Sequence, residues 1–235
     1  MNQILKEILS KRNEIKAKIL TRFFKTGKGE YGEGDVFLGI TVPVSRSIAQ
    51  KYGDLPLFEI SKLLQNKYHE VRLIALLILV HKYKSSPTPG IGEKKKIVSF
   101  YLKNTKYINN WDLVDLSAQY ILGDYLLDKD PKILIKLAKS NNLWERRIAI
   151  ISTFAFIYMG QSKWTIHIAK MLLKDPESLI HKASGWMLRE VGKRVSESDL
   201  TLFLDRHWKD MPRTMLRYAI ERLSETKRKY YLKLR

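Results

Sequence analysis

The sequence predicts an all-α fold made of stacked helix pairs. Apolar residues recur three or four positions apart over most of the 235-residue chain, which is the period of an amphipathic helix. Short breaks rich in Gly, Pro, Asn and Asp separate these segments, and the alternation typical of β-strands is absent. The longest apolar runs, 73–80 and 148–159, are shorter than the roughly 20 residues of a membrane span. We therefore expect a soluble, cytoplasmic protein.

The N-terminal part combines a predicted helix over 1–26 with a glycine-rich connection over 27–42. The helix has an apolar face whose residues recur at helical spacing, namely Ile4, Ile8, Ile15 and Ile19. Five glycines between Gly27 and Gly39 disfavour regular structure in the connection. The run that starts at Val36 is strand-like, but no later segment offers it a partner. We therefore interpret 27–42 as an ordered connection.

From residue 43 to 223 the chain alternates between helical segments and short breaks. The breaks are predicted at Gly53–Asp54, Asn66–Lys67, Ser85–Gly92, Asn109–Asn110, Lys129–Pro131, Asn141–Asn142, Gly160–Ser162, Asp175–Pro176, Ser196–Ser198 and Met211–Pro212. Pro131, Pro176 and Pro212 stand where a proline can open the next helix. Residues 224–235 form a basic C-terminal tail, either the end of a helix or a disordered arm. We expect a single domain over 1–235.

Four segments share a basic residue ahead of an apolar run: EVRLIAL, ERRIAI, HKASGW and LRYAIE. Their basic residues are Arg72, Arg147, Lys182 and Arg217, and the last three are 35 residues apart. Counting back 35 residues from Arg147 reaches Asp112, and counting back another 40 residues reaches Arg72. Helix pairs repeated at this length are typical of HEAT or TPR solenoids, in which equivalent second helices line a concave face. We predict a right-handed, curved α-solenoid of HEAT-like pairs with a basic concave groove.

The charge balance indicates an anionic partner. The chain has 43 Lys and Arg against 24 Asp and Glu, a net charge of +19 with neutral histidine. A compact protein does not need this imbalance, so nucleic acid is the first candidate and an acidic membrane surface the second. The absence of cysteine excludes disulfides, thiolate zinc sites and a cysteine nucleophile. The alternative meaning of scattered Lys and Arg is a solvated helix surface.

The segment NNWDLVD places two carboxylates and a tryptophan at a predicted helix start. Asp112 fits the capping of free N–H groups there. Asp115 follows Trp111 by four residues, so the two side chains share one face of the helix. In a groove that binds phosphates, a carboxylate weakens nucleic-acid binding, so its presence there would indicate a catalytic role. It can stabilise a developing cation or position a water molecule for attack.

A second stripe combines Lys182, Trp186 and Arg189 at spacings of four and three residues. The small residues at 183–185 would let a backbone or a ligand approach closely. Trp144 and Trp164 are interpreted as structural, because an isolated tryptophan is usually a large core residue.

Five stretches together resemble the AlkD-type DNA alkylation repair glycosylases over almost the whole chain: GEYGEGDVFLGITVPVSR, NNWDLVDLSAQYILGDYLL, LWERRIAIISTF, LIHKASGWMLREVGKR and MPRTMLRYAIERL. The resemblance implies a HEAT-like repeat fold. It also implies hydrolysis of the N-glycosidic bond of cationic N-alkylated purines, such as 7-methylguanine and 3-methyladenine, in duplex DNA.

The resemblance further implies the site residues. Asp115 matches the catalytic carboxylate, Trp111 the lesion-facing aromatic and Arg147 the DNA-contacting arginine beside them. Trp186 matches the second aromatic and Arg189 a backbone-contacting arginine. From the basic series, the remaining DNA-binding candidates are Lys182, Arg72 and Arg217.

An alkylated purine is already a cationic leaving group, so we expect neither a general acid nor a cofactor. No lysine stands out as a Schiff-base nucleophile, which favours a monofunctional glycosylase without lyase activity. The histidines lack HExxH spacing, and the glycine-rich connection is neither a P-loop nor GxGxxG, so no metal and no nucleotide are expected. A monomer acting on double-stranded alkylated DNA is expected. Two alternatives are a catalytically silent DNA-structure binder of the same fold and a scaffold that binds an acidic peptide.

Overall fold

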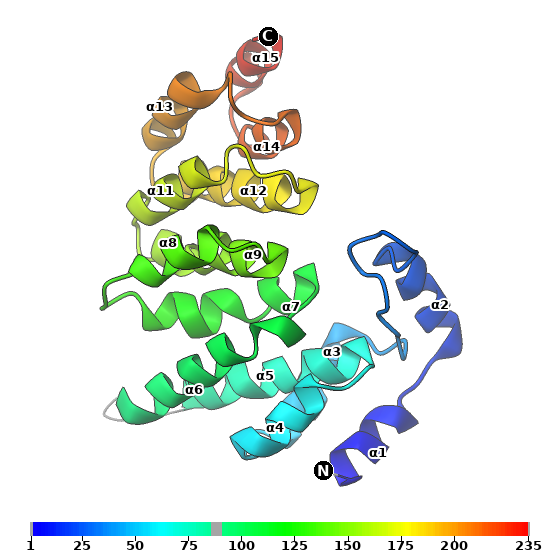
Figure 1. The fold of residues 1–235 in the computed structure, drawn as a ribbon. Coiled ribbons are helices and arrows are strands. Elements are labelled where there is room, and N and C mark those ends of the chain that lie inside the picture. The colour runs from blue at the N-terminus through cyan, green and yellow to red at the C-terminus, as the bar shows by residue number, and fades with distance from the viewer. Residues whose placement is uncertain (1, 86–90, 235) are drawn as a thin grey trace. The chain divides into compact units, whose positions relative to one another are not determined.

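The computed structural model describes residues 2–85 and 91–234. In this part the chain is helical, and its β-structure is limited to one isolated parallel bridge between Val36 and Tyr68. The predicted all-α class is therefore confirmed. The chain separates into two compact units, Met1–Ser117 and Ala118–Arg235 (Figure 1). No helix of the described residues is long and apolar enough to cross a membrane.

The first unit contains the helices of the N-terminal half. In chain order they are α1 (Asn2–Ser10), α2 (Glu14–Phe23), α3 (Val42–Lys51), α4 (Leu57–Leu64), α5 (His69–Ser85), α6 (Ile91–Lys103), the 3₁₀ helix η1 (Thr105–Tyr107) and α7 (Trp111–Asp115). Helix α5 is the core of the unit, because almost its entire length is buried and both α3 and α4 pack against it. The predicted loop at Ser85–Gly92 falls mainly on 86–90, outside the described residues.

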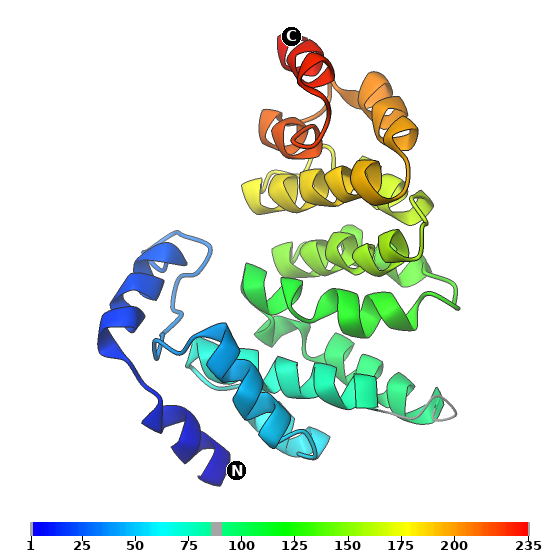
Figure 2. The same ribbon diagram turned by 180° about the vertical axis from the view of Figure 1, so that it is seen from behind.

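The prediction of one helix over 1–26 is wrong, because the chain turns between α1 and α2. The backbone N–H of Asn13 donates to the carbonyl of Leu38 at 2.8 Å, and the Asn13 side chain caps α2 by accepting from the N–H of Lys16 at 2.9 Å. These two contacts take Asn13 out of the helical hydrogen-bond pattern. Figure 2 shows α1 and α2 as separate helices. Ile4 and Ile8 of α1 are buried, whereas α2 has no buried residue.

The glycine-rich connection is ordered, as predicted, but the expectation that Val36 lacks a partner is wrong. Val36 bridges to Tyr68, directly before α5. The buried carboxylate of Glu70 accepts three successive backbone N–H groups of the connection, those of residues 38, 39 and 40, at 2.8–3.2 Å. Gly39 has φ +82°, and a Cβ there would lie 2.1 Å from the carbonyl oxygen of Asn13. Only glycine fits this crossing of two backbones.

The second unit contains the helices of the C-terminal half. They are the π-helical turn η2 (Gln119–Gly123), α8 (Lys132–Ala138), α9 (Leu143–Ser152), α10 (Phe154–Tyr158), α11 (Lys163–Met171), α12 (Ser178–Arg194), α13 (Glu197–His207), α14 (Arg213–Ala219) and α15 (Glu225–Lys233). Helix α12 packs against α9, α11, α13 and α14. The small residues at 183–185 serve the contact with α14, because a Cβ on Gly185 would lie 2.4 Å from the carbonyl oxygen of Met215.

The predicted breaks within the described residues fall at helix boundaries. Within the basic tail, Glu225–Lys233 form the helix α15, which is capped by Ser224. Tyr231 is buried and donates from its hydroxyl to Asp205 at 2.7 Å, and Arg213 donates to the carbonyl oxygen of Leu232 at 2.9 Å. These contacts hold α15 against α13 and α14.

The structure shows that α9 aligns with α5 one residue earlier than the sequence repeat predicted. Arg72 is the fourth residue of α5, and Arg146 is the fourth residue of α9. Each donates from Nη1 to the carbonyls five and six residues earlier, in the turn that precedes its helix. Each also pairs with a buried aspartate, Arg72 with Asp35 and Arg146 with Asp175. The equivalent of Arg72 is therefore Arg146, and the predicted equivalence with Arg147 is wrong.

Candidate functional site

Helix α7 presents Trp111 and Asp115 one turn apart. The helix has only five residues, and the intervening Leu113 and Val114 are fully buried. Asn110 caps its N-terminus by accepting from the backbone N–H of Trp111 at 2.8 Å. Trp111 and Asp115 are half-buried, so α7 directs both functional groups to the edge of the protein core. The charge of Asp115 also reaches the phenol of Tyr101: burial, chiefly, and then this charge raise the tyrosine pKa.

Aromatic side chains fix the indole of Trp111. Phe24, directly after α2, stacks on it with ring centroids 5.2 Å apart and planes 15° from parallel. Phe23 meets it edge-on at 6.0 Å. Phe24 also stacks on Phe37 of the connection at 4.9 Å. One face of the indole is therefore covered, and its orientation is set by contacts with the N-terminal segment.

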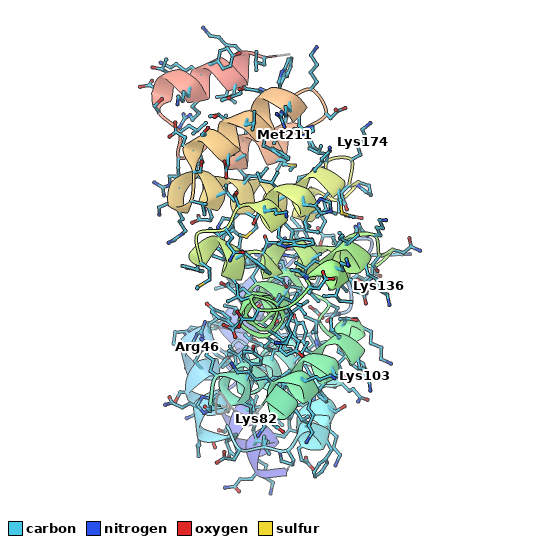
Figure 3. The ribbon with its side chains drawn as sticks, turned by 90° about the vertical axis from the view of Figure 1, so that its left-hand side faces the viewer. Arg46, Lys82, Lys103, Lys136, Lys174 and Met211 are labelled. Atoms are coloured by element: carbon cyan, nitrogen blue, oxygen red, sulfur yellow. The ribbon has the colours of Figure 1, made fainter. Side chains whose placement is uncertain are left out.

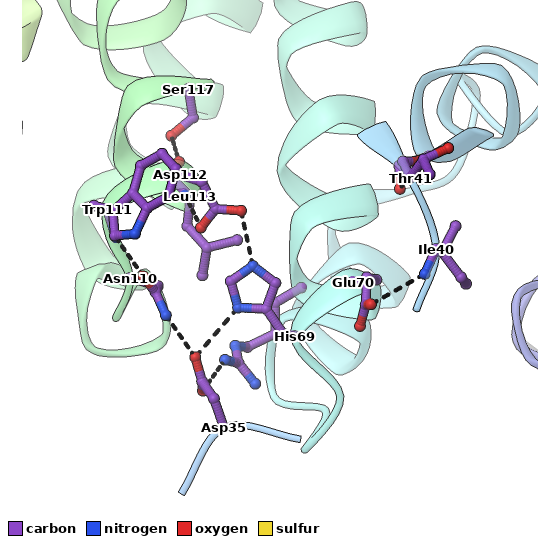
Figure 4. A network of polar contacts seen from close by, with 12 residues as sticks. Asp35, Ile40, Thr41, His69, Glu70, Asn110, Trp111, Asp112, Leu113 and Ser117 are labelled. Carbon is purple, nitrogen blue, oxygen red and sulfur yellow. Dashed lines mark hydrogen bonds and ion pairs between the residues drawn. The ribbon is translucent and has the colours of Figure 1, made fainter. Parts of the chain in front are cut away.

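A buried charged cluster lies beneath the start of α7 (Figure 4). We use "Asp35 cluster" for Asp35, His69, Arg72, Asn110 and Asp112, which are all less than one tenth exposed. The imidazole of His69 lies 3.2 Å from Asp35 through Nδ1 and 2.8 Å from Asp112 through Nε2. Asn110 donates to Asp35 at 2.8 Å, and Arg72 donates to the other oxygen of Asp35. Three segments distant in sequence thus meet at one carboxylate.

The cluster favours the charged forms of His69 and Asp35. Burial disfavours the imidazolium of His69, but the carboxylates of Asp112 and Asp35 outweigh this and raise its pKa to about 9. Burial likewise disfavours ionised Asp35, yet His69, Arg72 and Asn110 lower the pKa of that carboxyl. Asp112 accepts from the backbone N–H of Leu113 at 2.9 Å, so the predicted helix-start role holds, with His69 as a partner that the sequence did not reveal.

The other predicted site residues belong to the second unit. Arg147 is buried in α9 and donates from Nη1 to the carbonyl oxygen of Leu179 at 2.7 Å, at the start of α12. Lys182 is exposed on α12. Trp186, one turn later, is half-buried and meets Phe154 edge-on at 5.6 Å.

Arg189 is held by two carboxylates. It donates to Glu190 at 3.0 Å and to Glu221 at 2.5 Å. Burial opposes its charge, but these glutamates raise the pKa of Arg189. Glu190 also accepts from Arg194 at 2.7 Å. Arg217 is exposed on α14.

The structure divides the predicted basic series by burial. Lys182 and Arg217 are open to solvent, whereas Arg72 and Arg147 are only 5% exposed and bond to other parts of the protein. Arg72 is thus a core ion-pair residue, contrary to the expectation of a residue exposed for DNA. Positive charge is also spread over other parts of the chain: Arg46, Lys103 and Lys136 are exposed on helices, and Lys174 is exposed in the turn after α11 (Figure 3).

Sequence reasoning missed Asp35, His69 and Glu70. The available signal was the polar pair His69–Glu70 at the head of the long apolar run of α5. Polar residues that close to a buried segment need internal partners. Their partners lie 30 to 43 residues away in sequence, and the spacing of motifs does not identify them.

Comparisons with known proteins show the family of this chain. The fold matches a solved structure described as a predicted DNA alkylation repair enzyme from Enterococcus faecalis, with TM-score 0.71 and 17% identity over 92% of this chain and 98% of that one. It also matches AlkD2 from Streptococcus mutans, with TM-score 0.56 and 18% identity over 90% and 99%. No curated protein matches the chain. The model of the DNA alkylation repair enzyme family matches residues 4–223. The chain therefore belongs to the DNA alkylation repair enzyme family.

Proposed function

We propose that this protein is a monofunctional glycosylase that removes cationic N-alkylated purines, such as 7-methylguanine and 3-methyladenine, from duplex DNA. The observation that carries the proposal is the presentation of Trp111 and Asp115 on one face of α7, at the edge of the core, in a chain of this family. The net charge of +19 suits a polyanionic substrate.

The proposed hydrolysis needs one carboxylate but no general acid, because the alkylated purine already carries a positive charge. The C1′–N bond of the alkylated nucleotide breaks, and its electron pair neutralises the positive charge of the purine. The sugar passes through an oxocarbenium-like state, which the negative charge of Asp115 stabilises. A water molecule adds to C1′ and gives its proton to Asp115, which passes it to solvent. The products are the free base and an abasic site.

The remaining residues bind the substrate in this proposal. The indole of Trp111, which shares a helix face with Asp115, packs against the sugar and the cationic nucleotide, where cation–π attraction favours the alkylated form. Trp186 provides a further aromatic contact for the DNA. Lys182 and Arg217 are exposed and neutralise phosphates. Arg189, which is paired with Glu190 and Glu221, is a third candidate for a backbone contact. Arg147 acts indirectly by holding the start of α12 through the carbonyl oxygen of Leu179. Arg72 is left out, because its guanidinium serves the core.

Base release from methylated duplex DNA tests the proposal. Mass spectrometry of the released material should detect 7-methylguanine or 3-methyladenine, and the DNA strands should stay intact until the abasic sites are cleaved by alkali. Strand cleavage by the protein itself would contradict the monofunctional mechanism. Tight, salt-sensitive DNA binding without any released base would contradict the glycosylase and support a catalytically silent DNA-structure binder.

A further inference from the structure

We propose that His69 is a positioning residue for the reaction: clamped between Asp35 and Asp112, it fixes the start of α7 and so sets the place of Trp111 and Asp115. This inference rests on the proposed function for its consequence in catalysis. The geometry that it assigns to His69 can be tested without any activity.

Helix α7 needs external support because of its length. Five residues form little more than one turn, and so short a helix is not stable by itself in water. Its first residues are held from two sides: Asp35 accepts from the side chain of the cap residue Asn110, and His69 contacts Asp112. Since Asn110 in turn accepts from the backbone N–H of Trp111, the cluster is bonded directly to the backbone of the functional helix.

The same imidazole also takes part in the aromatic packing. Phe37 stacks on the ring of His69 with centroids 4.6 Å apart, and Phe24 lies 5.0 Å from it. Phe24 covers one face of Trp111. His69 therefore reaches Trp111 by two routes, one through hydrogen bonds and one through stacked rings.

The contacts of His69 require an imidazolium. Both ring nitrogens face carboxylate oxygens, and an ionised carboxylate only accepts hydrogen bonds. Both nitrogens must then carry a proton. Two other charged groups near the ring have their own partners: Arg72 neutralises Asp35, and Glu70 accepts from the backbone of the connection. The charge of His69 therefore balances that of Asp112. The raised pKa of about 9 agrees with this geometry.

Fluorine NMR of the full chain provides a readout that is independent of activity. The five tryptophans are replaced by 5-fluorotryptophan, and the Trp111 signal is assigned with the variant Trp111→Phe. In the wild type we expect the Trp111 signal to titrate with an apparent pKa near 9, together with the side-chain signals of His69. In His69→Gln the Trp111 signal should shift and lose this titration, while the signals of Trp144, Trp164 and Trp208 stay in place.

Kinetics provide the second readout. Under single turnover, His69→Gln should remove an alkylated base about 10- to 100-fold more slowly, because small displacements of reacting groups carry penalties of this size. Its affinity for a duplex with a stable abasic analogue should stay within about twofold, since the proposed phosphate contacts lie elsewhere. His167→Gln, at an exposed position, is the matched control.

The outcomes separate the two proposals. A wild-type protein without base release refutes the glycosylase, whereas the Trp111 titration still tests His69. An unchanged Trp111 signal and an unchanged rate in His69→Gln overturn the positioning role. If His69→Gln does not fold, the wild-type titration decides: a Trp111 signal that titrates together with the side-chain signals of His69 supports the role, and a Trp111 signal that does not follow them refutes it.

Discussion

The Nε2 atom of His69 lies 2.8 Å from a carboxylate oxygen of Asp112, which joins the head of α5 to the start of α7 across 43 residues of sequence. With Asp35 on the other ring nitrogen, this contact sets a buried imidazolium between two carboxylates. We therefore expect both the stability of the first unit and the geometry of α7 to depend on the protonation of His69.

Protein stability should fall at alkaline pH. The pKa of His69 is raised from 6.5 to about 9, so its stabilising contribution is complete below pH 6.5 and is lost as pH rises through about 9. Urea unfolding between pH 6 and pH 10 should show the free energy of unfolding declining across this window. His69→Gln should be less stable at neutral pH and lack the decline. The same slope in both proteins would assign the pH dependence to other groups.

The carboxylate of Glu70 should be a major stabilising group of the first unit. Glu70→Ala leaves three backbone N–H groups of the connection without their acceptor, and we expect a loss of about 3 kcal/mol in the free energy of unfolding. Glu70→Gln keeps one oxygen as acceptor and should lose less. Chemical denaturation measures both, with Glu93→Gln as an exposed control. Equal stability of wild type and Glu70→Ala would show that the connection does not depend on this carboxylate.

Arg146 should stabilise the second unit through its pair with Asp175. Arg146→Ala breaks a partly buried pair with Asp175 and leaves two turn carbonyls without their donor, so a loss of about 2–3 kcal/mol is expected. The double variant with Asp175→Asn should cost less than the sum of the single changes. Thermal or urea unfolding of the three variants tests this cycle, and additive effects would argue against a coupled pair.

The exposed cations should account for part of the salt dependence of DNA binding. Lys182→Ala and Arg217→Ala should each weaken binding to duplex DNA and lower the slope of log affinity against log salt by about 1. Lys136→Ala, exposed on α8, is a control of equal charge change. Slopes that equal the wild-type value in both variants would remove these side chains from the interface.

The sequence predicted the elements better than their contacts. Helix boundaries followed local signals such as Pro131 and Pro212, so the breaks were found. The split at Asn13 was missed, because it depends on a hydrogen bond to Leu38 from another segment. Likewise, the sequences around Arg72 and Arg147 look equivalent. Only the hydrogen bonds to the preceding turn reveal that Arg146, one residue earlier, is the true equivalent of Arg72.

For the candidate site, the pairing of Trp111 with Asp115 was predictable from the sequence, whereas the residues that hold their helix were not. Trp111 and Asp115 are close in sequence and share a helix face, so spacing alone paired them. The residues that hold their helix are far away in sequence, and the burial of His69 and Asp35 follows from packing, which no local pattern encodes.

The most direct test of the central claim is the single-turnover rate of base release from a duplex with one 7-methylguanine, for wild type, Asp115→Asn and the exposed control Asp128→Asn. The proposed mechanism predicts that Asp115→Asn is about 100- to 1,000-fold slower, because it removes the charge that stabilises the oxocarbenium-like state. It also predicts that DNA binding is retained and that Asp128→Asn matches the wild type. Release by Asp115→Asn at the wild-type rate would contradict the assignment of the catalytic carboxylate.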